Sequence, residues 1–117
     1  MGDNRRRFVR VRATLRFTFA WADDRGEHFE LFRTLDVSAG GLLLTRHVVG
    51  SVKPGLGVEG EGAFNVDSTE IRARAVVVRV TDDGFAVRLT NLPRHLEDKI
   101  VAWVFRIEAH RVSRRLS

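Results

Sequence analysis

The stretch Val11-Arg-Ala-Thr-Leu-Arg-Phe-Thr-Phe-Ala-Trp21 decides the fold class, because every second residue in it is apolar. Arginine and threonine occupy most of the intervening positions. A period of two is the pattern of a β-strand with one buried and one solvated face. The sequence therefore predicts a half-buried strand over residues 11–21. The residues expected to face inward are Val11, Ala13, Leu15, Phe17, Phe19 and Trp21.

Further strands are expected downstream of this one. The turn sequence Asp23-Asp24-Arg25-Gly26 leads into residues 27–37, which continue the alternation and predict a hairpin. The residues expected to face inward on this second strand are Phe29, Leu31, Leu35 and Val37.

Four further segments complete the predicted β-structure. A short strand is expected to start at Leu42 and Leu44, others at residues 58–66 and 70–80, and a last one after the hairpin signal Asp82-Asp83-Gly84. The alternation changes parity near Ala75–Val76, which indicates a β-bulge or burial on both faces.

The C-terminal part changes period. Apolar residues recur there at steps of three and four, which predicts an amphipathic helix from Pro93 to about Arg115. We therefore expect a mainly β fold, a six-stranded antiparallel (split) β-barrel with a long C-terminal α-helix over an open end or edge. The expected organisation is a flexible arm (1–10), a barrel (11–92) and a helix (93–117). The helix stripe consists of Leu96, Ile100, Trp103, Val104 and Ile107.

Composition narrows the function classes. The 117 residues are 44% hydrophobic and contain no cysteine, which fits one domain without disulfides or thiolate ligands. No apolar run approaches the ~18 residues of a membrane span, and no signal peptide is visible, so a cytoplasmic protein without membrane insertion is expected. The four histidines lack metal-ligand spacing, and no catalytic triad stands out. We expect no metal, no cofactor and no enzyme activity.

The charge is uneven. The net charge is +5, and 18 of the 20 basic residues are arginine. Residues 1–16 carry +5, residues 106–117 carry +3 and the middle carries −3. Basic ends either keep the chain solvated or attract phosphates, and both interpretations are open.

One phosphate motif is rejected. Gly55-Leu-Gly57-Val-Glu-Gly60 has the letters of the dinucleotide-binding GxGxxG sequence. That motif requires a strand before it and a helix after it, whereas here a Pro-Gly turn precedes it and no helical period follows. A turn followed by a strand is expected.

Two other segments carry a specific signal. Arg6-x-x-x-Arg10 precedes the first strand, and Asp36-x-Ser38-x-x-Gly41 connects two strands. With 18 arginines, chance alone yields about 2.7 RxxxR pairs, but only about 0.04 matches to the second pattern. Both segments, in this order and context, resemble the PilZ domain, a bacterial receptor for cyclic di-GMP recognised by RxxxR and [D/N]xSxxG. The resemblance covers about residues 5–111.

The resemblance implies a ligand and a site. Cyclic di-GMP is a dianion with two guanines, and the guanidinium groups of Arg6 and Arg10 can fork onto phosphate or a guanine edge, or stack on the bases. Asp36 suits the guanine N–H edge, and Ser38 can donate to the ligand. Gly40 and Gly41 permit positive φ and close backbone approach. Arg5 and Arg7 add contacts or charge, and Arg79 is the nearest match to a residue that contacts a base in the family.

The implied mechanism is a relay in bacterial signalling, such as motility or biofilm control. Ligand would order the N-terminal arm and change a surface read by an unidentified effector protein. A monomer or weak homodimer is expected, without a nucleic-acid polymer as partner.

Two alternatives stay open. One is a PilZ-fold interaction adaptor that does not need the nucleotide. The other is a small-barrel binder of single-stranded nucleic acid, which would use surface arginines and phenylalanines. The expected inward direction of the phenylalanines argues against the second alternative. The arginines concerned are Arg12, Arg16, Arg72 and Arg74.

Overall fold

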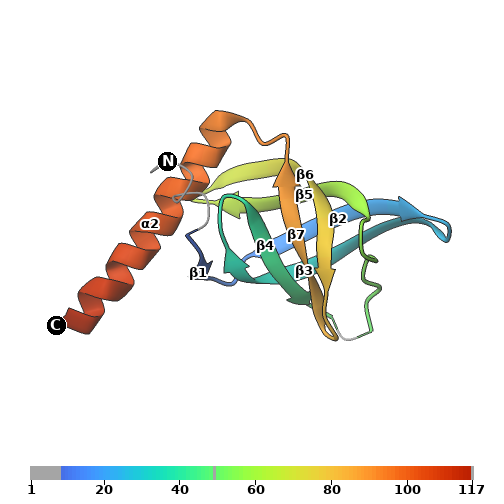
Figure 1. The fold of residues 1–117 in the computed structure, drawn as a ribbon, viewed down its shortest axis with the longest axis horizontal. Coiled ribbons are helices and arrows are strands. Elements are labelled where there is room, and N and C mark those ends of the chain that lie inside the picture. The colour runs from blue at the N-terminus through green and yellow to red at the C-terminus, as the bar shows by residue number, and fades with distance from the viewer. Residues whose placement is uncertain (1–8, 49, 117) are drawn as a thin grey trace.

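The computed structural model describes residues 9–48 and 50–116 of the chain, with side chains up to residue 114. Seven strands are followed by one long helix (Figure 1). The elements are β1 (Val11–Arg12), β2 (Arg16–Asp23), β3 (Gly26–Val37), β4 (Gly41–Arg46), β5 (Glu59–Val66), β6 (Thr69–Val80), β7 (Gly84–Thr90) and α2 (Arg94–Leu116). The mainly β architecture with a C-terminal helix is confirmed.

Six of the strands close into an antiparallel barrel. The strand order is β1-β3-β2-β5-β6-β7-β4, and an additional pairing of β3 with β4 joins the two ends. The closed ring is therefore β3-β2-β5-β6-β7-β4, while β1 is added along β3. Closure removes the exposed edges that an open sheet would leave. The expectation of a six-stranded antiparallel barrel is confirmed.

The barrel interior is filled by aromatic and branched side chains. Phe17, Phe19, Phe32 and Phe85 are fully buried. The rings of Phe32 and Phe85 meet edge to face with their centroids 4.7 Å apart. Burying such side chains stabilises a fold by roughly 1.5–3 kcal/mol each, so this cluster is a main source of the barrel's stability.

The first predicted strand is interrupted. It forms β1 and β2, separated by residues 13–15, and both halves lie along β3. The buried hydroxyl of Thr34 accepts a hydrogen bond from the Leu15 N–H (2.8 Å) and donates one to the Ala13 carbonyl (2.5 Å). This side chain replaces missing ladder bonds inside the barrel, so the interruption leaves these backbone groups paired.

The inward residues predicted for β3 are partly wrong. Phe29 is 69% exposed and Leu35 is 46% exposed, and Phe32 and Thr34 point into the barrel instead. A register shift between Thr34 and Asp36 then returns Val37 to the core. A bulge of this kind adds one residue, so the inward-facing residues change from even-numbered to odd-numbered positions within the strand. A prediction that assumes one regular alternation along the whole strand is therefore wrong for part of it.

A second bulge lies in β6, close to the position expected from the sequence. Burial alternates regularly from Ile71 to Val77, and the register with β7 shifts between Val77 and Arg79. The parity change occurs about two residues later than predicted. As a result Val78 and Val80 face outward.

The glycines of the rejected GxGxxG pattern have structural roles. Gly57 has a positive φ of 82° in the loop before β5. Gly60 lies within β5, where an added Cβ would be 2.2 Å from the Ala20 carbonyl oxygen of the neighbouring strand. These positions confirm a turn followed by a strand.

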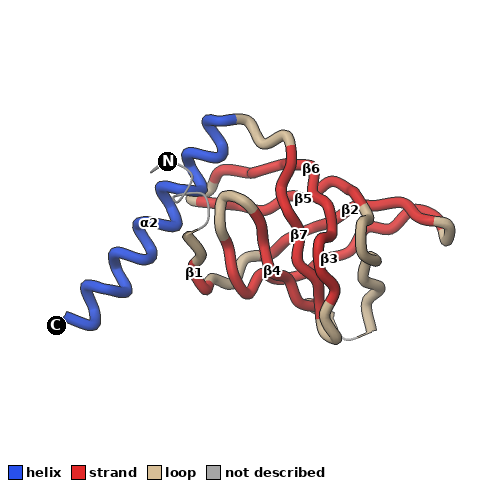
Figure 2. The backbone as a smooth tube through the Cα atoms, viewed as in Figure 1, coloured by secondary structure: helices blue, strands red, loops and turns tan. Residues whose placement is uncertain are grey.

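The helix crosses one end of the barrel and its C-terminal part extends beyond it (Figures 1 and 2). Ile100 and Val104 are fully buried against the barrel, as the predicted stripe requires. The helix is more apolar around its circumference than expected, since Phe105 and Val112 are exposed on it. Among the described residues, no helix combines the length and the apolar character that a membrane crossing requires.

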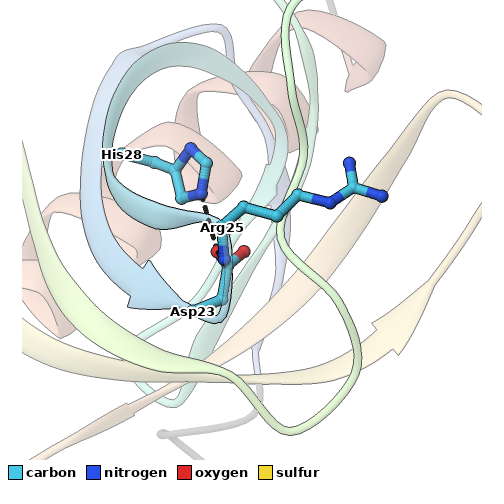
Figure 3. A network of polar contacts seen from close by, with 3 residues as sticks. All are labelled: Asp23, Arg25 and His28. Carbon is cyan, nitrogen blue, oxygen red and sulfur yellow. Dashed lines mark hydrogen bonds and ion pairs between the residues drawn. The ribbon is translucent and has the colours of Figure 1, made fainter.

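The hairpin of β2 and β3 extends from the opposite end of the barrel and carries a polar network (Figure 3). The carboxylate of Asp23 accepts hydrogen bonds from the His28 Nε2–H (2.9 Å) and the Arg25 backbone N–H (2.8 Å). The His28 ring also stacks on Trp21 at 4.9 Å between centroids. The hydrogen bond from His28, followed by the one from Arg25, lowers the pKa of Asp23 below its ordinary value of 3.8.

Candidate functional site: an arginine-rich groove on the barrel wall

A groove of about 530 Å³ lies on the outer wall of the barrel, within the size range of small-molecule sites. It is bordered by the segment before β1, the end of β3 and the turn after it, and strands β4, β6 and β7. The lining residues are Arg10, Asp36, Ser38, Gly40, Gly41, Leu42, Leu43, Val78, Arg79, Ala86, Val87, Arg88 and Leu89.

Strand register sets the width of this groove. Asp36 on β3 pairs with Leu43 on β4, Leu43 pairs with Ala86 on β7, and Ala86 pairs with Arg79 on β6. These four residues form one row across four adjacent strands. Neighbouring strands lie about 4.8 Å apart, so the backbones of Asp36 and Arg79 are roughly 14 Å apart across the row. The two apolar residues Leu43 and Ala86 lie between them.

Four charged side chains face the groove without partners in the described part of the chain. Arg10, Arg79 and Arg88 are exposed, and Asp36 is half-buried. No ion pair or hydrogen bond engages any of the four side chains within residues 9–48 and 50–114. Three positive charges against one negative charge give this surface a net charge of +2. The groove is therefore suited to a doubly negative ligand.

Ser38 is occupied by the turn itself. Its hydroxyl donates to the Gly41 carbonyl and accepts from the Gly41 N–H, both at 3.2 Å, while the Ser38 N–H donates to the same carbonyl at 3.0 Å. The residue is 5% exposed. In this structure Ser38 shapes the corner between β3 and β4 rather than presenting a free donor to the groove.

The two glycines of the turn act through close approach rather than positive φ. Among the described glycines, φ is positive at Gly26, Gly50 and Gly57, so the expectation for Gly40 and Gly41 is wrong. An added Cβ on Gly41 would lie 2.4 Å from the Val87 carbonyl oxygen. The absence of a side chain lets β4 approach β7, and the Gly40 carbonyl accepts from the Leu89 N–H at 3.1 Å.

The structure brings most of the predicted site residues together. Six of them line one groove, although they come from three separate stretches of the chain. Arg5, Arg6 and Arg7 lie outside the described residues, and so does most of the predicted arm. The six residues in the groove are Arg10, Asp36, Ser38, Gly40, Gly41 and Arg79.

Arg88 is the charged groove residue that the sequence analysis missed. It pairs with Gly41 across β4 and β7 and faces outward beside it. A signal for it was present, because Phe85, Val87 and Leu89 point inward and the intervening Arg88 must then point outward. What the sequence did not reveal was that β7 lies next to β4.

Comparisons with solved structures support this fold. The inhibitor of motility MotI/DgrA of Bacillus subtilis superimposes with a TM-score of 0.69 at 15% identity, covering 87% of this chain and 50% of that chain. This chain thus spans half the length of that protein. The PilZ domain of CeSA from a cellulose-synthesizing bacterium gives a TM-score of 0.62 at 20% identity, covering 85% of this chain and 97% of that domain. An uncharacterized Legionella protein gives 0.51 at 14% identity, with 92% and 99% covered.

Curated protein sequences contain no significant match to this chain. The family model of the PilZ domain, by contrast, matches residues 4–106, which is most of the chain. That range includes both sequence motifs and all the residues that line the groove. The chain therefore belongs to the PilZ domain family, a family of cyclic di-GMP receptors and adaptors.

Proposed function

We propose that this protein binds cyclic di-GMP in the groove between β3, β4, β6 and β7. The observation that carries the proposal is the convergence on a single groove of three arginines and one aspartate that have no partner among the described residues. The ligand carries two phosphates, so its charge matches the +2 of these four side chains. Its two guanines present both hydrogen-bond acceptors and N–H donors. The guanidinium groups of the groove can only donate, and the Asp36 carboxylate can only accept, so both kinds of guanine atom find a partner.

The chemistry of each group suggests its partner on the ligand. The guanidinium groups of Arg10, Arg79 and Arg88 can each fork onto two phosphate oxygens or onto the O6/N7 edge of a guanine. The carboxylate of Asp36 would be repelled by phosphate, so its role is to accept from the N1–H and N2–H of a guanine. The apolar residues between Asp36 and Arg79 offer a flat contact surface for a purine ring.

Calorimetric titration with cyclic di-GMP tests the proposal. We expect Arg10→Ala, Asp36→Ala and Arg88→Ala each to weaken binding by about 10- to 100-fold, the range of a lost charge-assisted hydrogen bond. Arg6→Ala is expected to act in the same direction, because Arg6 is the first arginine of the motif. Arg16→Ala is the matched control, since this exposed arginine lies on β2 and does not line the groove.

Two results would contradict the proposal. The first is absence of binding by the wild-type protein, which would favour the adaptor alternative. The second is equal weakening by Arg16→Ala and Arg10→Ala, because the effect would then reflect net charge rather than the groove. Titration with cyclic di-AMP separates base recognition from phosphate attraction, since adenine lacks the N–H edge assigned to Asp36.

We also propose that binding is relayed to an effector protein through residues 2–10. Arg10 lines the groove, and the other arginine of the motif, Arg6, precedes it by four residues along the chain. Hydrogen exchange should become slower in residues 2–10 when cyclic di-GMP is added. Unchanged exchange in this segment, with ligand bound, would exclude this form of relay.

A further inference from the structure

The bulge in β6 is a feature that the pairing of the barrel strands does not require. The register of β6 with β7 skips Val78, whereas the residues on either side of it, Val77 and Arg79, are both paired. On the β5 side, the last backbone bonds of β6 within the described residues are at Val77, whose N–H donates to the Val58 carbonyl at 2.9 Å. A strand without Val78 would therefore pair with both neighbours in the same register.

The extra residue is costly for the fold and adds nothing to the core. Val78 exposes 48% of its surface and belongs neither to the buried cluster nor to the side chains packed against it. A bulge interrupts the ladder locally, and an apolar side chain left in water gains nothing from the hydrophobic effect. Folding therefore does not explain why the chain contains this residue.

The bulge in β3 differs in this respect. Its extra residue, Leu35, also serves the gap between β1 and β2, because the Leu35 carbonyl accepts a hydrogen bond from the Ala13 N–H at 3.3 Å. In the described part of the chain, no backbone hydrogen bond outside the strand ladders reaches Val78. The β6 bulge thus lacks the structural role that the β3 bulge has.

The location of the β6 bulge points to the groove instead. Consecutive residues of a regular strand point to opposite faces, yet Val78 and Arg79 both line the groove. A bulge bends its strand and changes the direction of a side chain, and bulges are over-represented beside functional sites. Here the bulge places an apolar side chain directly next to a guanidinium group on one wall of the groove.

Arg79 and Arg88 have different places in this groove. Arg79 ends the row of four residues that begins at Asp36, whereas Arg88 lies on β7 between Gly41 of β4 and Val76 of β6. A cyclic dinucleotide has its two phosphates in a central ring and its two bases at opposite ends. A ligand that lies along the row has its phosphates near Arg88 and its bases near Asp36 and Arg79.

We propose that Val78 is a positioning residue of the groove: its bulge directs the Arg79 guanidinium to the edge of one guanine, and its side chain packs against the face of the same base. The inference rests on the proposed function and deepens it. Guanidinium donors match the O6 and N7 acceptors of guanine, whereas adenine has an amino donor in place of O6. Arg79 in this position disfavours adenine, while Val78 itself contacts either purine equally.

Deletion of Val78 tests the bulge. The variant should fold, because its strand register is unchanged, and circular dichroism and thermal unfolding verify this. Calorimetry then compares cyclic di-GMP with cyclic di-AMP. We expect the affinity for cyclic di-GMP to fall about 10- to 100-fold and the affinity for cyclic di-AMP to fall less. The preference for guanine shrinks without disappearing, because Asp36 still recognises the other base.

Val78→Ala tests the side chain separately, since it leaves the number of residues in the strand unchanged. The loss of two methyl groups should weaken the binding of both nucleotides by a similar factor of about 3 to 10, so the preference for guanine stays the same. Val80→Ala is the matched control. Val80 is also an exposed valine of β6, with 42% of its surface accessible, but it does not line the groove.

A double-mutant cycle shows whether Val78 acts through Arg79. In an Arg79→Ala background, deletion of Val78 should no longer change the ratio of the affinities for the two nucleotides, because the guanidinium that distinguishes them is already absent. A general loosening of the barrel would lower both affinities in either background and would leave this ratio unaffected by the presence of Arg79.

The outcomes separate this inference from the proposed function. Absence of cyclic di-GMP binding by the wild-type protein overturns both. Wild-type binding with an unchanged affinity and guanine preference in the deletion variant overturns the inference alone. The same holds for a change in preference that persists in the Arg79→Ala background, and for equal losses in Val78→Ala and Val80→Ala. A deletion variant that does not fold also overturns the inference, because the barrel itself would then require Val78.

Discussion

At the scale of single residues, Gly41 and Thr34 show how side-chain size and hydrogen bonding shape this barrel. Gly41 is needed because the β7 backbone occupies the space of its Cβ. Thr34 is needed because its hydroxyl bridges the gap between β1 and β2. Gly41 lines the groove, whereas Thr34 is buried inside the barrel.

Gly41→Ala should destabilise the protein. The new Cβ would collide with the Val87 carbonyl oxygen and push β4 away from β7, at a cost of about 1–3 kcal/mol, typical of overpacking. Thermal unfolding measures this as a midpoint lower by several degrees. Gly55→Ala is the control, because its Cβ would meet nothing within 4 Å and its φ is not positive. Equal midpoints for the two variants would contradict the steric explanation.

Ser38→Ala should also act on stability. The substitution removes the hydroxyl that both donates to and accepts from the Gly41 backbone, and leaves the half-buried Gly41 N–H without this partner. A loss of about 1 kcal/mol is expected. Chemical denaturation measures the free energy of unfolding, and cyclic di-GMP titration of the folded variant measures affinity. A large loss of affinity with unchanged stability would show that Ser38 contacts the ligand directly.

At the scale of elements, the β2–β3 hairpin carries a pH-dependent contribution. The pKa of Asp23 is lowered in the folded protein by the hydrogen bonds from His28 and Arg25, so folding favours the ionised carboxylate. The corresponding stability is fully present above the unfolded pKa of about 3.8 and is lost as the pH falls through the lowered folded pKa.

Asp23→Asn should therefore lower the thermal midpoint at pH 7, and the difference from wild type should shrink as the pH falls below 4. Thermal unfolding from pH 7 to pH 2 follows this difference. Asp24→Asn is the control, since no hydrogen bond engages the Asp24 side chain among the described residues. A difference between Asp23→Asn and wild type that does not change with pH would exclude the carboxylate as its source.

At the scale of the whole molecule, the charge distribution favours the proposed binding of a dianion. The net charge of +5 and the arginines around the groove create a positive field for a dianion. The association rate of cyclic di-GMP should therefore fall as salt is raised from 0.05 to about 0.5 M, because the screening length shortens from about 14 Å to about 4 Å. Stopped-flow fluorescence with a labelled ligand measures the rate. A rate independent of salt would contradict electrostatic steering.

The local period of the sequence determined which segments are strands and which is the helix, because side-chain direction along an element depends only on its own backbone. Its motifs also predicted Arg10, Asp36 and Gly41 as site residues, and these three residues line one groove. The sequence did not locate the bulges accurately. The extra residue between Thr34 and Asp36 depends on how β3 pairs with β4, and the pattern within β3 alone does not contain that information.

Only the tertiary structure decided how the barrel closes and what meets on its wall. The row from Asp36 through Leu43 and Ala86 to Arg79 spans two pairs of consecutive strands, β3–β4 and β6–β7, which the pairing of β4 with β7 joins although the two pairs are far apart in sequence. Arg88 joins the groove for the same reason. Register between distant strands results from packing the whole core, so no local pattern contains it.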